Sequence, residues 1–269
     1  MLNLRQSDKE MITRTAQKII RRRALFFRKY TRLFKGALKQ QIKPVLDKIS
    51  EVEDFRMFEG EVEKLIKEGP IEKVLKQCWI QVGIYFAQYQ VNELKGMDVI
   101  FDTKSEEEDL WLRQMRQWAE AEAGINIVSI TGESKKQALK FIRQTMTEGS
   151  IEGWGIEKIQ REMRRNLVNK WGEMSIYRSR MIAQTEIIGA SNKASFMGAK
   201  SAGIELVKSW LLGSGNPRDT HMQAANFNNR VPMNKPFIVA GIDCEHPGDA
   251  SLPTEEVINC HCCVDYAPI

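Results

Sequence analysis

The chain has 269 residues, of which 42% are hydrophobic and 28% are charged, and its formal net charge is +5. This composition is typical of a globular protein with one large domain or two modest ones, and it excludes a disordered chain. No apolar run reaches the length of a bilayer-spanning helix, and the N-terminal residues lack the pattern of a secretory signal. We therefore expect a reducing compartment, where clustered cysteines are thiols or metal ligands more often than disulfides.

Positive charge is concentrated near the N-terminus. Between Met11 and Leu46 there are eleven Lys or Arg residues and no Asp or Glu. Apolar residues recur there at steps of three or four, which predicts a helix that Pro44 ends or kinks. This basic arm is expected to meet an acidic protein surface or DNA, and a solvated helix face is the alternative. The contact candidates are Arg21, Arg22, Arg23, Arg28, Lys29 and Arg32.

Two more helical patterns follow, over residues 52–66 and 71–94, separated by the helix breaker Gly69-Pro70. Gly96 is expected to cap the second of them. The composition then turns acidic and polar at residues 97–106. We place a boundary there, which gives an N-terminal helical domain with the basic arm over residues 1–104 and a second domain over residues 105–269.

The second domain is predicted to be helical over residues 105–203. Residues 124–130 (GINIVSI) are β-branched and follow a glycine, which favours a strand or an extended connector. Ser134 is expected to cap a helix that ends near Gly149. Ser175 is expected to open a long helix that Gly203 stops.

Four polar residues interrupt the apolar and small positions of that last helix: Gln184, Thr185, Glu186 and Asn192. Buried polar groups need hydrogen-bonding partners. These side chains are therefore expected to face a site or to form a hydrogen-bonded joint with another part of the chain.

A small α+β part is predicted over residues 204–269. Residues 204–212 (IELVKSWLL) favour a strand, and Asn216 and Pro217 are the expected N-cap and first residue of a short helix. Strands are also expected at residues 237–241 (FIVAG) and 259–266 (NCHCCVDY). The predicted fold class is thus mainly α, with an N-terminal region of long helices followed by a helical and small α+β C-terminal domain.

Cysteine and histidine cluster in the C-terminal part. Three of the five cysteines lie in the last ten residues, whereas Cys78 lies on an apolar helix stripe and is expected in the core. Zinc prefers thiolate and imidazole ligands. A four-ligand site from the pairs Cys244/His246 and Cys260/Cys262 is feasible, and so is a three-ligand site that uses His221. The candidate metal ligands are therefore His221, Cys244, His246, Cys260 and Cys262.

Alternatives to a metal remain open. On a strand, Cys260 and Cys262 would share one face, but the C-x-C spacing lacks the two-residue gap of common zinc knuckles. A metal-free cluster of buried thiols and histidine and a disulfide are the other interpretations. A cysteine nucleophile with His221 as its base is chemically conceivable, but the sequence carries no cysteine-enzyme signature and no phosphate-binding loop. We read Glu255 and Glu256 as solvated, assign no catalytic residue and expect no enzyme.

Several motifs occur in a recognisable order after residue 107. They are Ala183-Gln184-Thr185-Glu186, Asn192, Gly203, Trp210, Asn216-x-Arg218-x-x-His221, Pro247-Gly248 and the segment from Ile258 to Cys262. In this order they resemble the phage Mu F-like head morphogenesis proteins, which are minor head proteins of tailed phages. Gln184, Asn216 and His261 depart from that pattern, which has Arg, Asp and Arg there. The motif residues expected to be structural are Thr185, Glu186, Asn192, Trp210, Arg218, His221, Cys260 and Cys262.

The resemblance implies a structural virion component bound at the portal vertex inside the capsid. It implies a role in head assembly, with DNA packaging or ejection as further expectations. The partners would be the portal protein, the scaffold or major capsid protein and packaged DNA, but no membrane. The protein would lie in the host cytoplasm during assembly and in the virion afterwards. Structural zinc is the one cofactor considered. The alternative function is a nucleic-acid-binding module with a zinc-stabilised C-terminal fold, whose binding would weaken steeply with salt.

Overall fold

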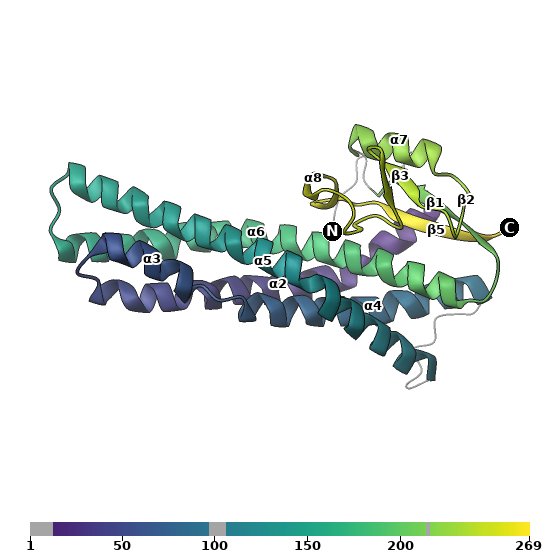
Figure 1. The fold of residues 1–269 in the computed structure, drawn as a ribbon, viewed down its shortest axis with the longest axis horizontal. Helices are drawn as coiled ribbons and strands as arrows, with labels where there is room; N and C mark the ends of the chain where they lie inside the picture. The colour runs from purple at the N-terminus through teal and green to yellow at the C-terminus, as the bar shows by residue number, and fades with distance from the viewer. Residues whose placement is uncertain (1–12, 97–105, 214–215) are drawn as a thin grey trace. The chain divides into compact units, whose positions relative to one another are not determined.

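Helices make up most of this protein (Figure 1). The structure is a computed structural model that describes residues 13–96, 106–213 and 216–269. Its long helices precede a small region of antiparallel strands, which confirms the predicted fold class. The helices before that region are α2 (Arg14–Lys48), the short 3-10 helix η1 (Ile49–Glu51), α3 (Phe55–Leu65), α4 (Gly69–Lys95), α5 (Glu106–Ile151) and α6 (Ile156–Ser201).

The described residues form two compact units, each built from segments that are not contiguous in sequence. We call the one made from the described residues of 1–29, 76–121 and 181–269 the sheet unit, and the one made from the described residues of 30–75 and 122–180 the helical unit. Each unit takes helices from both sides of the boundary predicted at residues 104 and 105. The acidic segment that motivated this boundary falls largely at residues 97–105, outside the described residues.

Apolar side chains from four helices make the core of the helical unit. Because the apolar residues of each helix recur about once per turn, they form one stripe that is buried against its neighbours. Asp54 begins α3 as its N-cap, since its side chain accepts hydrogen bonds from the backbone of Arg56 and Met57. The buried core residues include Ile42, Val45, Phe58, Val62, Ala138, Ile142, Met163, Leu167 and Trp171.

A buried polar network also joins helices of this unit. The hydroxyl of Ser134 lies 3.0 Å from Gln41 Oε1 and accepts a 3.0 Å hydrogen bond from Arg178 Nη1. Gln41 Nε2 in turn donates to Thr131 Oγ1 at 3.1 Å. The prediction that Ser134 caps a helix is therefore wrong: it lies inside α5, where its hydroxyl has partners on other helices.

Pro44, predicted to end or kink its helix, lies inside α2 and does not end it; its side chain is exposed, where the carbonyl that loses its hydrogen bond can be hydrated. Two other predictions on helix extent are wrong. Residues 124–130 belong to α5, with Ile127 buried and Ile125 exposed, a burial pattern of helical rather than strand period. Ser175 lies within α6, fully buried, and its hydroxyl donates to Gly172 O at 2.9 Å.

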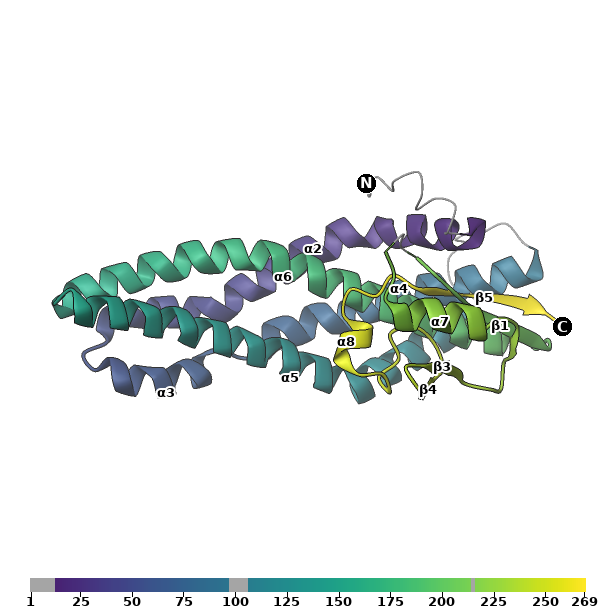
Figure 2. The ribbon, with the colours of Figure 1, turned by 90° about the horizontal axis from the view of Figure 1, so that it is seen from above.

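The strands of the sheet unit form two small sheets. They are β1 (Leu206–Leu211), β2 (Val231–Pro232), β3 (Phe237–Val239), β4 (Ile242–Cys244) and β5 (Cys263–Pro268). An antiparallel sheet has the order β2-β1-β5, with Trp210 opposite Val264, and β3 pairs with β4 as a hairpin. Helix α7 (Asp219–Phe227) packs against β1 and β3, and α8 (Thr254–Val257) is a single turn before β5 (Figures 1 and 2). The predicted strands at residues 204–212 and 237–241 are thus confirmed.

Helices α2, α4, α5 and α6 contribute their own contacts to the sheet unit. The indole rings of Trp79 and Trp118 stack at a centroid distance of 3.9 Å. Phe196 and Ala199, near the end of α6, pack into the same core as Trp210. Gly96 ends α4 with a positive φ of 64°, which confirms the predicted cap. Among the described helices, none combines the length and apolarity needed to cross a bilayer.

Candidate metal site

His221, Cys260 and Cys262 bring three metal-ligating atoms together in the sheet unit. His221 Nδ1 lies 3.4 Å from Cys262 Sγ and 3.8 Å from Cys260 Sγ, and all three donor atoms lie within 4.8 Å of one another. Ligands at zinc bond lengths in a tetrahedron would place nitrogen and sulfur about 3.6 Å apart. The observed distances fall on either side of that value, so the three side chains are already spaced for one metal ion.

The local structure behind this cluster differs in two ways from the prediction. Helix α7 begins at Asp219 with Arg218 as its N-cap, two residues later than predicted, which puts His221 in its first turn. Strand β5 begins only at Cys263, so Cys260 and Cys262 are not brought together by strand alternation. They lie in the irregular segment before it, where the backbone N–H of Cys262 donates to Cys260 Sγ at 3.3 Å.

Glu256 lies on the other side of the histidine ring. Its Oε2 is 2.9 Å from His221 Nε2 and accepts a 2.9 Å hydrogen bond from Thr220 Oγ1. The first contact has the distance of an ion pair without the alignment of a hydrogen bond. The carboxylate favours a proton on Nε2, because a bare lone pair there would face its negative charge. Metal ligation through Nδ1 requires this tautomer, in which Nδ1 carries no proton.

The prediction that Glu256 is solvated is therefore wrong, since its exposed fraction is 8%. Nothing in the local sequence signals this role. The single turn α8 that carries Glu256 is placed opposite α7 only in the folded chain.

The two thiols of Cys260 and Cys262 differ in acidity because they interact with each other. The hydrogen bond from the Cys262 thiol holds the pKa of Cys260 well below its usual value, and the same bond raises the pKa of Cys262 well above it. Burial raises the pKa of the neighbouring Cys263 to about 11. Cys260 is therefore the more acidic of the two thiols, and a divalent cation would displace the remaining thiol proton.

Motif residues hold the backbone of the segment that carries these cysteines. Thr185 Oγ1 accepts a 3.3 Å hydrogen bond from the backbone N–H of Asn259, and Arg218 Nη2 donates to Ile258 O at 2.5 Å. Asn192 Nδ2 donates to Cys262 O at 3.1 Å. The segment is thus tied to α6 on one side and to the start of α7 on the other.

Arg23 reaches the same segment from the basic helix. Its exposed fraction is only 5%, and it donates to Ser191 Oγ at 2.8 Å, Asn192 Oδ1 at 2.6 Å and Cys262 O at 3.1 Å. Burial lowers the pKa of this guanidinium. The prediction that Arg23 contacts a partner or DNA is therefore wrong, because its side chain is buried and hydrogen-bonded inside the sheet unit.

The other basic-arm candidates differ in exposure. Arg22 lies over the ring of Tyr89, with its guanidinium carbon 4.2 Å from the ring centroid. Lys29 donates to Gln81 Oε1 at 2.5 Å but keeps an exposed side chain. The candidates with exposed side chains are Arg21, Arg28, Lys29 and Arg32.

The polar residues of α6 and Trp210 complete the surroundings of the cluster. Gln184 Nε2 lies 3.4 Å from His261 Nδ1. Trp79 Nε1 donates to Glu186 Oε2 at 2.8 Å. The ring of Trp210 meets that of His221 edge to face at 5.7 Å. The predicted hydrogen-bonded joint along α6 is confirmed.

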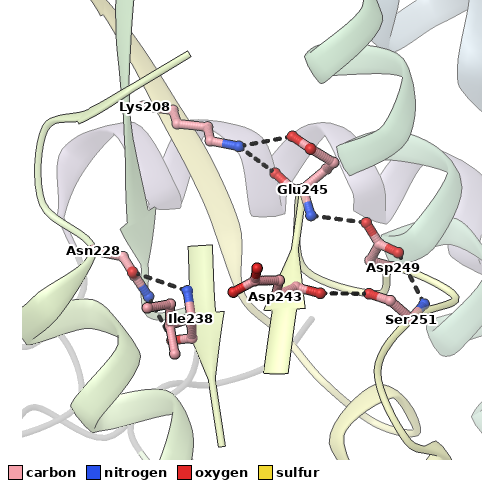
Figure 3. A network of polar contacts seen from close by, with 7 residues as sticks. All are labelled: Lys208, Asn228, Ile238, Asp243, Glu245, Asp249 and Ser251. Atoms are coloured by element: carbon pink, nitrogen blue, oxygen red, sulfur yellow. Dashed lines mark hydrogen bonds and ion pairs between the residues drawn. The ribbon is translucent and has the colours of Figure 1, made fainter. Parts of the chain in front are cut away.

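Cys244 and His246 do not belong to the metal-ligating group. Cys244 ends β4 opposite Phe237, and His246 Nδ1 lies 3.2 Å from Pro247 O. Asp249 holds this turn by accepting hydrogen bonds from the backbone of Glu245 and Ser251 (Figure 3). Cys244 therefore packs in the core, and His246 contacts the backbone of the turn that follows β4.

A buried lysine anchors the same turn. The Lys208 side chain is fully buried, and its Nζ donates to the backbone oxygen of Glu245 at 3.1 Å and to its carboxylate at 3.0 Å (Figure 3). The ammonium also lies 4.5 Å from the ring centroid of Phe237. A charge buried in this way needs these partners, which tie β1 to the turn after β4.

A cleft of about 340 Å³ opens at the three donor residues. Its lining consists of Asn216, Pro217, Arg218, His221, Asn259, Cys260, His261 and Cys262. Gly213 allows the chain to pass close by, because any side chain there would collide with His261 O. All five cysteines are free thiols, so the arrangement offers two sulfurs and one nitrogen to a borderline-soft cation.

No family model, curated protein or solved structure matches this chain.

Proposed function

We propose that this chain is a minor head protein of a tailed phage, a structural component bound at the portal vertex inside the capsid. In this proposal it acts in head assembly, with a further role in DNA packaging or ejection. The resemblance of its motifs to phage Mu F-like head morphogenesis proteins motivates the proposal, and one structural observation supports a structural role for those motifs.

That observation is where the motif residues meet. Thr185, Asn192 and Arg218 each hold the backbone between Ile258 and Cys262, and His221 packs against both cysteines of this segment. Residues from distant parts of the sequence thus build one joint. Contacts to backbone atoms stabilise a conformation and do not present reactive groups to a substrate, which favours an architectural motif.

The proposed cofactor of the joint is structural zinc. His221 Nδ1, Cys260 Sγ and Cys262 Sγ would hold it, and Glu256 would fix the histidine ring from its far side. Bound zinc supplies folding free energy, because the site exists only in the folded chain. Two thiolates and a neutral imidazole would leave the divalent ion with no net charge.

The exposed cations of α2 are the proposed partner surface. Arg21, Arg28 and Arg32 project from a stretch without acidic residues, and such a surface attracts acidic protein or phosphate. Arg23 is excluded from this surface by its burial.

Incorporation into heads tests the proposal. A phage deleted for this chain would be complemented with the wild type, with Arg21→Gln/Arg28→Gln/Arg32→Gln, or with Lys140→Gln/Arg180→Gln/Lys200→Gln. The control variant loses the same charge from exposed positions outside the acid-free stretch. We expect wild type and control in purified heads, with the α2 variant reduced. Absence of the wild-type chain from purified heads and from portal complexes would contradict the proposal.

The second candidate is a nucleic-acid-binding module, which the same exposed cations favour. Phosphate contacts weaken steeply with salt, whereas a largely apolar protein interface does not. Binding of the chain to duplex DNA and to purified portal protein would be measured from low to high salt. Tight, salt-sensitive DNA binding together with no portal binding would favour this second function.

A further inference from the structure

The metal-ligating group supplies three donors. Among the described residues, no fourth His, Cys, Asp or Glu donor joins His221, Cys260 and Cys262 within the 4.8 Å that these atoms span. Glu256 is directed to His221 Nε2 and therefore faces away from the sulfurs. Structural zinc sites are usually closed by four protein ligands, whereas sites with three keep one position for an external ligand.

The free side of the group faces the cleft. All three donor residues line it, so an ion held by them would have its fourth position directed into this space. His261 also lines the cleft, and its Nδ1 lies 3.4 Å from Gln184 Nε2. A ligand from outside can therefore approach without displacing a protein donor.

The cleft carries positive charge and polar donors. Arg218 lines it with a guanidinium that uses Nη2 for Ile258 O. Helix α7 begins beside the cleft with Arg218 as its N-cap, and the positive end of the helix dipole there favours an anion. The amides of Asn216 and Asn259 add neutral polar groups. The ligand that suits this surrounding is a small anionic oxygen donor.

We infer that a metal bound by His221, Cys260 and Cys262 keeps its fourth position open for a carboxylate, which Arg218 helps to hold. This inference rests on the proposed metal. The carboxylate can come from a free small molecule or from an Asp or Glu side chain of a partner protein. In both cases the affinity of the cleft for the carboxylate depends on the bound metal.

Cobalt substitution tests both steps separately. The full chain would be stripped of metal by a chelator under reducing conditions and reloaded with Co²⁺. A thiolate-to-cobalt charge-transfer band at one equivalent would report the site itself. Acetate would then be titrated while the cobalt d–d bands are followed. We expect a saturable shift of these bands with the charge-transfer band retained.

Variants and probes define the ligand. Arg218→Met should weaken acetate binding roughly tenfold or more, by loss of a charge-assisted contact. Because Arg218 also holds Ile258 O, acetate is titrated only into samples whose charge-transfer band shows one bound Co²⁺ per chain. Arg218→Lys keeps the charge, so its affinity for acetate should lie between those of the wild type and Arg218→Met. A capped Gly-Glu-Gly peptide compared with Gly-Gln-Gly distinguishes the sources: tighter binding of the Glu peptide than of acetate indicates a protein side chain, and the reverse indicates a small molecule.

Three results would contradict the inference in whole or in part. A charge-transfer band with d–d bands that no carboxylate moves would mean a closed site, with a donor from this chain such as His261 in fourth place, and would leave the proposed metal standing. No charge-transfer band at all would remove the metal and the inference together. A shift by acetate that is unchanged in Arg218→Met would retain the open position and contradict the role of Arg218.

Discussion

Arg23 Nη2 donates a 2.6 Å hydrogen bond to Asn192 Oδ1, although the two residues are 169 positions apart. This contact joins the basic helix α2 to the motif helix α6 inside the sheet unit. Asn192 also contacts the cysteine segment, because its amide nitrogen donates a hydrogen bond to Cys262 O. The N-terminal helix and the cysteine segment are therefore held by one polar network.

Loss of the Arg23 side chain should destabilise the protein. Arg23→Met removes the donor to the buried Ser191 Oγ and Asn192 Oδ1 and one of the two donors to Cys262 O, which should lower the free energy of unfolding by roughly 2–4 kcal/mol. Arg21→Met, on the exposed side of the same helix, should change it by less than about 0.5 kcal/mol. Urea denaturation followed by circular dichroism measures both. Equal effects of the two variants would mean that the buried network does not contribute.

The cysteine cluster should carry one metal ion. Inductively coupled plasma mass spectrometry of the purified chain should find about one zinc per chain, and Cys260→Ser/Cys262→Ser should find none. A chelator should lower the melting temperature of the wild type and leave that of the double variant unchanged. Cys263→Ala is the matched control, since Cys263 is buried beside the cluster without belonging to it. Its metal content should equal that of the wild type.

Two results would revise this interpretation. A wild type without metal, unaffected by the chelator, would leave a hydrogen-bonded thiol cluster. A double variant that is as stable as the wild type but fails in phage production would point to reactive cysteines, with His221 and Glu256 in the positions of base and orienting acid.

Glu256 should tune the metal site without ligating it. Glu256→Gln keeps a side chain of the same size but removes the charge that favours the proton on His221 Nε2. Metal affinity should fall by about 10–100-fold, the usual effect of losing such a partner. Competition with a chromogenic chelator measures this. An unchanged affinity would show that the carboxylate serves only the contact with Thr220.

The stability of the sheet unit should depend on pH through His246. Burial lowers the pKa of this histidine to about 4, with Lys193 and Lys208 adding to the shift and Asp249 and the contact with Pro247 O opposing it. Between the unfolded pKa near 6.5 and about 4, the unfolded chain binds a proton that the folded chain does not. Stability is therefore retained above about pH 6.5 and is lost progressively as the pH falls toward 4.

The variant His246→Gln isolates this contribution. Between neutral pH and about pH 4.5, both proteins should lose free energy of unfolding. The loss in His246→Gln should be smaller than the loss in the wild type, by roughly 2–3 kcal/mol at most. Urea midpoints at the two pH values give the comparison. Parallel losses in both proteins would mean that His246 does not titrate in this range.

Residues 1–104 should not fold alone. Trp79 is buried by stacking on Trp118 and bonds to Glu186, both of which lie after residue 104. In the helical unit, the Leu38 carbonyl accepts from Trp171 Nε1 at 3.0 Å. We expect the fragment to lack a cooperative thermal transition and to regain one when co-expressed with residues 105–269. Cooperative unfolding of the isolated fragment would support the domain boundary predicted from composition.

Periodicity predicts much of the fold because most of these helices bury one stripe. It predicts α4 and β1 closely, where caps, apolar rhythm and breakers agree. It fails at residues 124–130, where β-branched residues favour a strand locally but tertiary packing buries Ile127 at helical spacing. The same cause hides the continuity of α6, because Ser175 resembles a cap in sequence and is a buried hydroxyl in the fold.

The candidate site is predictable in its reactive residues and not in their partners. His221, Cys260 and Cys262 stand out by residue type, since few other residues bind soft metals. Arg23 has the same sequence signature as its exposed neighbours, so only the docking of α2 distinguishes it. The role of Glu256 depends on α8 lying opposite α7, which no local pattern encodes.

The hydrogen bond between Arg23 Nη1 and Cys262 O spans 239 positions and has a consequence for the order of folding. Contacts across such long loops are entropically costly to close and form late. At about 5–20 residues per second, the synthesis of α2 is complete roughly 11–43 seconds before Cys262 is added. During that interval the guanidinium of Arg23 is uncovered along with the other cations of the helix. The segment of the sheet unit that is made first is thus the one whose packing is completed last.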